Sequence, residues 1–96
     1  LGLVCVENTH NGAGGVAQDA AAMTALGAVA RRHGAPLHLD GARLWNAAVA
    51  TGDPIDALAA PADTVMVAFS KGLGAPVGAA LAGSAAAMAD AWTVRK

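Results

Sequence analysis

The chain has 96 residues, of which 55% are hydrophobic and 14% are charged, and its formal net charge is -1. This composition is too apolar for a disordered chain, and the near-neutral balance argues against a nucleic-acid surface, which needs clustered basic residues. So few charges cannot cover the surface of a small domain, and we expect a fragment of a larger buried structure.

The first half of the chain predicts two strands, each followed by a helix. Residues 1–8 (LGLVCVEN) form the apolar run of a buried strand, and residues 17–33 have the helical spacing of apolar side chains. Residues 36–40 predict a second strand and residues 42–51 a second helix. A glycine follows each helix, which is typical of a helix C-terminus.

The second half predicts a short helix, two strands and a last helix. Residues 53–59 begin a helical turn, with Asp53 as its N-cap and Pro54 in the first helical position. The two strands and the last helix are predicted over residues 64–70, 77–84 and 85–96. Buried strands that alternate with helices predict an α/β layered sheet. No linker marks a domain boundary, so we expect residues 1–96 to belong to one domain.

Polar side chains follow three of the predicted strands at their carboxyl ends, where ligands gather in open α/β sheets. His10 lies in the loop after the first strand. Asp40 ends the second strand, with Arg43 one helical turn further on. Ser70 and Lys71 follow the third strand. These residues are separated in sequence, but the fold class predicts that they share one edge of the sheet.

Each of these residues also has a structural explanation. Asp40 is placed to cap the next helix, Arg43 to be a solvated surface residue, His10 to be a turn residue and Lys71 to be an exposed loop lysine. Together, an acid, an arginine, a histidine and a lysine at strand ends predict a site. We expect His38, inside a strand, to be a hydrogen-bonded structural histidine with no catalytic role.

Lys71 is the only lysine before the final residue, and its chemistry narrows the kind of site. A buried lysine suits covalent binding of a carbonyl group, because desolvation favours its neutral, nucleophilic amine. A carboxylate that keeps a pyridine nitrogen protonated is the partner expected in pyridoxal phosphate enzymes. One cysteine and scattered histidines lack the spacing of zinc ligands, so we expect no metal.

The single cysteine, Cys5, excludes an internal disulfide and fits a reducing compartment, so we expect a cytoplasmic protein in which it is a small buried hydrophobe. Residues 72–89 carry no charge, but they are mostly glycine and alanine, which drive membrane insertion weakly. We interpret them as buried soluble structure and expect no membrane association.

Three stretches, ENTHN, LHLDGARLWNAAVA and SKGLGAPVGAALAG, resemble the low-specificity L-threonine aldolases of the aromatic amino acid β-eliminating lyase/threonine aldolase family. The resemblance covers nearly the whole chain. It implies the three-layer α/β/α large domain of the fold-type I (aspartate aminotransferase-like) pyridoxal phosphate enzymes. Residues 1–96 would be its central portion, without the N-terminal part and the small C-terminal domain.

The resemblance also implies a role for each candidate residue. Lys71 matches the lysine that binds pyridoxal 5'-phosphate covalently, and Asp40 matches the aspartate that pairs with the pyridine nitrogen. Arg43 matches an arginine near the phenolic oxygen of the cofactor and the substrate carboxylate. His10 matches a histidine near the β-hydroxyl of the substrate. Ser70 would lie beside the cofactor and help to orient it or its phosphate.

The implied activity is the reversible cleavage of L-threonine or L-allo-threonine, a β-hydroxy amino acid, to glycine and acetaldehyde by a homo-oligomer, dimer or tetramer. Two alternatives stay open. One is another fold-type I lyase that eliminates a β-substituent from an amino acid. The other is a non-catalytic structural module derived from such an enzyme.

Overall fold

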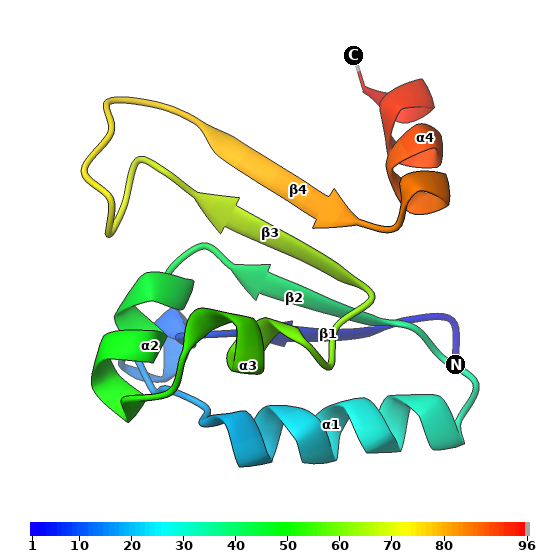
Figure 1. Cartoon of the computed structure of the whole chain (residues 1–96), viewed down its shortest axis with the longest axis horizontal. Coiled ribbons are helices and arrows are strands. Elements are labelled where there is room, and N and C mark those ends of the chain that lie inside the picture. The colour runs from blue at the N-terminus through cyan, green and yellow to red at the C-terminus, as the bar shows by residue number, and fades with distance from the viewer. Residues whose placement is uncertain (96) are drawn as a thin grey trace.

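The computed structural model describes residues 1–95, which form a four-stranded sheet with helices beside it (Figure 1). The strands are β1 (Val4–Glu7), β2 (Leu37–Gly41), β3 (Thr64–Ala68) and β4 (Ala79–Gly83). They neighbour one another in the order β1-β2-β3-β4; β1, β2 and β3 are parallel, and β4 is antiparallel to β3. The predicted α/β class is confirmed, and so is the order of the strands and helices.

The helices gather mainly on one side of the sheet. They are α1 (Ala20–Arg32), α2 (Leu44–Thr51), α3 (Ile55–Ala59) and α4 (Ala85–Val94), with a 3₁₀ turn η1 (Asn11–Ala13) after β1. In Figure 1, α1, α2 and α3 lie together on one side, and α4 lies beyond β4. Within residues 1–95, no helix combines the length and the hydropathy needed to cross a bilayer.

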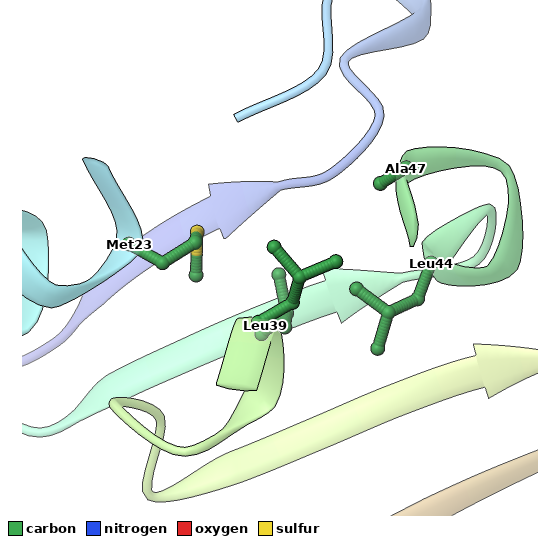
Figure 2. Packing of buried hydrophobic residues seen from close by; sticks show 5 residues of the cluster. Met23, Leu39, Leu44 and Ala47 are labelled. Carbon is green, nitrogen blue, oxygen red and sulfur yellow. The ribbon is translucent and has the colours of Figure 1, made fainter. Parts of the chain in front are cut away.

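The hydrophobic core lies between the sheet and the first three helices. Its centre is a cluster of side chains that are at most 1% exposed, namely Met23, Leu39, Leu44, Ala47 and Leu58. Figure 2 shows Met23 of α1, Leu39 of β2 and both Leu44 and Ala47 of α2 converging on this space. Val6, Val65 and Val67 pack against it from the neighbouring strands. The core therefore fixes which side chains of each strand face the helices.

The other side chains of β1, β2 and β3 face away from these helices, because successive residues of a strand point to opposite faces. His38 is one of them, and its Nδ1 lies 2.8 Å from Oγ1 of Thr64, so the predicted hydrogen bonding of this histidine is confirmed. Cys5 is another, and it is exposed. The predicted burial of Cys5 is wrong, because only one face of this apolar strand is covered.

Helix α4 begins a further layer on the face opposite α1, α2 and α3. Leu81 of β4 pairs with Met66, which alternates with the core residues Val65 and Val67. Leu81 and the α4 residues Met88 and Trp92 line a pocket of about 620 Å³. This position of α4 agrees with the third layer of the predicted α/β/α arrangement.

The prediction that residues 72–89 are buried is wrong for the described chain, where most of them are exposed. They form the loop after β3, the outermost strand and the start of α4. Since β4 is an edge strand in this sheet, little packs against its outer side.

The start of α1 corrects two predictions. The helix begins at Ala20 because Asp19 is its N-cap, and Oδ1 of Asp19 accepts a hydrogen bond of 2.8 Å from the Ala22 N–H. Oδ2 of Asp53 accepts a second one, also 2.8 Å, from the Ala20 N–H. Asp53 therefore does not cap the helix that follows it; the N-cap of α3 is Pro54. Two N–H groups that the first helical turn leaves unpaired are satisfied in this way.

We predict that Asp53→Ala lowers the free energy of unfolding by about 0.5–2 kcal/mol, the usual cost of losing a helix cap. Asp56→Ala is the matched control, because Asp56 is exposed in the first turn of α3. It should change the free energy by no more than about 0.5 kcal/mol, as surface substitutions usually do. Urea unfolding of the two variants measures the difference, and equal losses would show that Asp53 does not hold α1.

Candidate active site

The carboxyl ends of β1, β2 and β3 meet at one edge of the sheet, because these strands are parallel. Glu7 pairs in register with Asp40, and Asp40 pairs with Met66. All three side chains belong to the face that α1, α2 and α3 leave uncovered. Asp40 thus occupies the middle of this edge, as the sequence predicted.

Asp40 is held by its neighbours on one side only. Its Oδ1 accepts a hydrogen bond of 3.0 Å from the Ala42 N–H, and its main-chain oxygen accepts one of 2.9 Å from the Asn8 N–H. Helix α2 begins at Leu44 with Arg43 as its N-cap, so Asp40 is not a helix cap. Among the described residues, Oδ2 of Asp40 has no hydrogen-bond partner and can accept one from a ligand.

His10 is joined to a carboxylate by a short contact. Its Nδ1 lies 2.5 Å from Oε2 of Glu7, and Oε1 of Glu7 accepts from the Asn11 N–H at 3.4 Å. The hydrogen bond with His10 holds the pKa of the Glu7 carboxyl below its ordinary value of 4.5, against a partial desolvation that acts in the opposite direction. The Asn11 N–H and the charge of Arg43 lower this pKa further. Glu7 is therefore an ionised acceptor at neutral pH.

The main chain of His10 is fixed as well. Its N–H donates to the Val16 oxygen at 2.8 Å, and its oxygen accepts from the Gly15 N–H at 3.0 Å. These bonds close the loop that contains η1 over the end of β1. The position of the imidazole thus depends on the fold of the loop and on Glu7.

A pocket of about 450 Å³ lies at this edge, and it brings two of the predicted residues together. Its lining consists of Cys5, Val6, Glu7, His10, Gln18 and Asp40. Arg43 does not line it, but its charge acts on Glu7 from the start of α2. The pocket therefore combines an imidazole with two carboxylates, and a guanidinium stands close by.

Ser70 and Lys71 lie in the loop after β3, outside the lining of this pocket. Both are exposed, so the expectation of a buried Lys71 amine is not met among the described residues. The loop projects beyond the sheet and rests against α2. At Gly72 an added Cβ would lie 2.7 Å from Oδ1 of Asn46, so a larger residue there would require the exposed Asn46 side chain to move.

The ends of this loop are fastened to each other. The Phe69 N–H donates to the Gly78 oxygen, and the Ala75 N–H donates to the Phe69 oxygen, both at 2.9 Å. Lys71 therefore lies inside a closed segment that joins β3 to β4. Nowhere in residues 1–95, this edge of the sheet included, do three or more histidine, cysteine, aspartate or glutamate side chains form a group that could hold a metal ion.

Sequence reasoning missed two residues of this edge. Asn8 is fully buried, and its side chain makes two hydrogen bonds with the main chain of Gln18. Nδ2 of Asn8 donates to the Gln18 oxygen at 2.9 Å, and Oδ1 of Asn8 accepts from the Gln18 N–H at 3.0 Å. Glu7 stands in the stretch ENTHN, but the sequence predicted no role for it. The only trace of the contact in the sequence is a glutamate at the end of a strand, three residues before a histidine, and this spacing alone does not predict that the two meet.

The family model of the beta-eliminating lyases matches residues 1–96. Low-specificity L-threonine aldolase 1 of Arabidopsis thaliana is 49% identical over 98% of this chain and 26% of its own length. Low specificity L-threonine aldolase of Escherichia coli O157:H7 is 40% identical over 85% of this chain and 24% of its own length. The chain thus spans about a quarter of the curated relatives that it matches.

A solved structure has the same fold. It is a protein from Exiguobacterium sp. 255-15, assigned as an aromatic amino acid beta-eliminating lyase/threonine aldolase. It matches with a TM-score of 0.84 and 33% identity, over 95% of this chain and 26% of that one. The arrangement of β1 to β4 with their helices therefore recurs inside a larger protein.

We predict that Asn8→Asp destabilises the fold at least as much as Asn8→Ala. The new carboxylate would still accept from the Gln18 N–H, but its second oxygen would face the Gln18 carbonyl in a buried position. Leaving buried polar groups unpaired costs about 1–3 kcal/mol. Thermal unfolding checks this prediction, with Asn46→Asp on the exposed side of α2 as the control. A stability unchanged in Asn8→Asp would contradict it.

Proposed function

This chain belongs to the beta-eliminating lyase family, and we propose that it is part of an aldolase that cleaves L-threonine or L-allo-threonine, reversibly, to glycine and acetaldehyde. The observation that carries the proposal is the pocket that joins His10 and Asp40 at the carboxyl edge of the sheet. The 49% identity to a low-specificity L-threonine aldolase over 98% of the chain supports the substrate class.

The donor set at this edge fits pyridoxal 5'-phosphate. The carboxylate of Asp40 is half-buried, and its Oδ2 has no partner in residues 1–95, so it can hold a protonated pyridine nitrogen. Lys71 offers a primary amine after the neighbouring strand, and Ser70 offers a hydroxyl beside it. When bound, the cofactor supplies an electron sink for the electrons of the broken Cα–Cβ bond.

The remaining groups act on the substrate. The guanidinium of Arg43 binds the substrate carboxylate, since arginine presents a fork of donors that matches a carboxylate. His10 takes the proton of the β-hydroxyl group, directly or through a water molecule. Asp40 would hold the protonated pyridine nitrogen of the cofactor, and Lys71 would present its amine to the cofactor and then make room for the substrate amine.

The wider setting is part of the same proposal. Residues 1–96 form the central portion of the large domain of a fold-type I enzyme, which acts as a homo-oligomer, a dimer or a tetramer. The exposed apolar side chains of Leu73, Val77 and Trp92 support burial against further protein. The single cysteine supports a reducing compartment, the cytoplasm.

The test of this function is covalent labelling of the full-length protein. We predict that it carries a yellow, covalently bound cofactor, and that borohydride fixes this cofactor to Lys71. Lys71→Ala should lose the attachment and nearly all turnover. Lys71→Arg is the matched variant, because it keeps the charge but lacks a nucleophilic amine, and it should lose both as completely.

Product analysis accompanies the labelling. Acetaldehyde and glycine are expected from L-threonine. A keto acid and ammonia would assign a β-eliminating lyase instead. Labelling of another lysine, or full activity in Lys71→Ala, would overturn the proposed function.

We predict that Asp40→Asn lowers the turnover of the full-length protein by at least about tenfold, which corresponds to about 1.4 kcal/mol in the barrier. A neutral amide cannot hold the proton of a pyridine nitrogen as a carboxylate does. Cofactor binding should weaken less than turnover, which a titration of the apoenzyme with cofactor measures. Asp90→Asn, on the exposed surface of α4, is the control. Normal turnover in Asp40→Asn would leave Asp40 with a structural role only.

A further inference from the structure

The contact between Glu7 and His10 determines which nitrogen of the imidazole is free. Nδ1 of His10 lies 2.5 Å from Oε2 of Glu7. An ionised carboxylate can only accept hydrogen bonds, so Nδ1 must carry the hydrogen. In the neutral imidazole the other nitrogen, Nε2, then holds the lone pair.

Glu7 is itself fixed at the edge of the sheet. Its main chain belongs to β1 and pairs in register with Asp40. Its second oxygen, Oε1, accepts from the Asn11 N–H at 3.4 Å. The next residue, Asn8, is completely buried. A carboxylate held in this way can orient a side chain that rests on it.

The free side of the imidazole is bordered by a glycine. A Cβ added at Gly12 would lie 3.3 Å from Cε1 and 3.7 Å from Nε2 of His10. The absence of a side chain at Gly12 therefore leaves space beside Nε2. Because His10 and Asp40 line the same pocket, the imidazole of His10 belongs to the proposed substrate site.

We propose that Glu7 is a positioning residue for His10, holding the imidazole in the orientation and tautomer that leave Nε2 ready to accept the β-hydroxyl proton of the substrate. This inference rests on the proposed function. In the step concerned, the O–H bond breaks and its proton moves to Nε2. The oxygen electron pair forms the carbonyl group of acetaldehyde, and the Cα–Cβ bond pair stays with the glycine fragment. Glu7 then stabilises the imidazolium by its charge.

The experiment uses the full-length protein and combines Glu7→Gln with His10→Ala. We expect His10→Ala to lower kcat by roughly 10²–10⁴-fold, the usual contribution of a positioned acid–base group. Glu7→Gln should lower kcat by about 10–100-fold, in the range found for groups that orient a functional histidine, and leave KM nearly unchanged. The double variant should be no slower than His10→Ala alone, because Glu7 acts through His10.

Two further experiments distinguish the orientation of the imidazole from its access to the substrate. In ¹⁵N-histidine NMR spectra, the His10 imidazole should show a protonated Nδ1 that Glu7→Gln no longer enforces. Gly12→Ala should slow turnover by crowding the edge of the imidazole at Cε1, 3.3 Å from the added Cβ, while Nδ1 stays protonated in the NMR spectrum. Asp90→Asn serves as the control with normal kinetics and a normal spectrum.

Three results would overturn the inference. The first is normal turnover in Glu7→Gln. The second is a double variant in which Glu7→Gln lowers kcat by the same factor in the His10→Ala background as in the wild-type protein. The third is a His10 NMR signal that Glu7→Gln does not change. The inference and the proposed function can fail separately. Borohydride labelling of a lysine other than Lys71 overturns the function, whereas correct labelling with normal turnover in His10→Ala overturns only the role of His10 and Glu7.

Discussion

The in-register parallel pairing of β1, β2 and β3 is the constraint on which the other features depend. It brings Glu7 opposite Asp40 and places both at the same edge of the sheet. Leu39 faces the helices and is fully buried, so its neighbour Asp40 must face the other way. A slip of one residue would exchange the two faces, putting a carboxylate into the core and a leucine into the pocket. The packing of the core thus enforces the positions of the polar groups.

The features that the sequence predicts are those with a local physical cause. Apolar runs mark β1 and β3, and Gly52 ends α2 in the left-handed conformation, with a φ of 78°. The role of Asp53 could not be predicted, because its partner, the Ala20 N–H, lies 33 residues away in sequence. The exposure of Cys5 could not be predicted for a different reason. Its neighbours are all apolar, so no alternation shows which face is open.

The same distinction holds for the candidate site. Asp40 and His10 were predicted because polar residues at strand ends share one edge in an α/β sheet. The contact of His10 with Glu7 is local, but three residues of spacing predict no contact until the turn is known. The exposure of Lys71 depends on what covers the loop after β3. No short stretch of sequence carries that information.

The loop between β3 and β4, which contains Lys71, leaves the sheet and returns to it at nearly the same point, because the two strands are antiparallel. The hydrogen bond between Phe69 and Gly78 closes the loop at its base, where the two antiparallel strands begin to pair. Lys71 lies between these two ends, so a substitution inside the loop can alter the position of its amine while the pairing of β3 with β4 is kept.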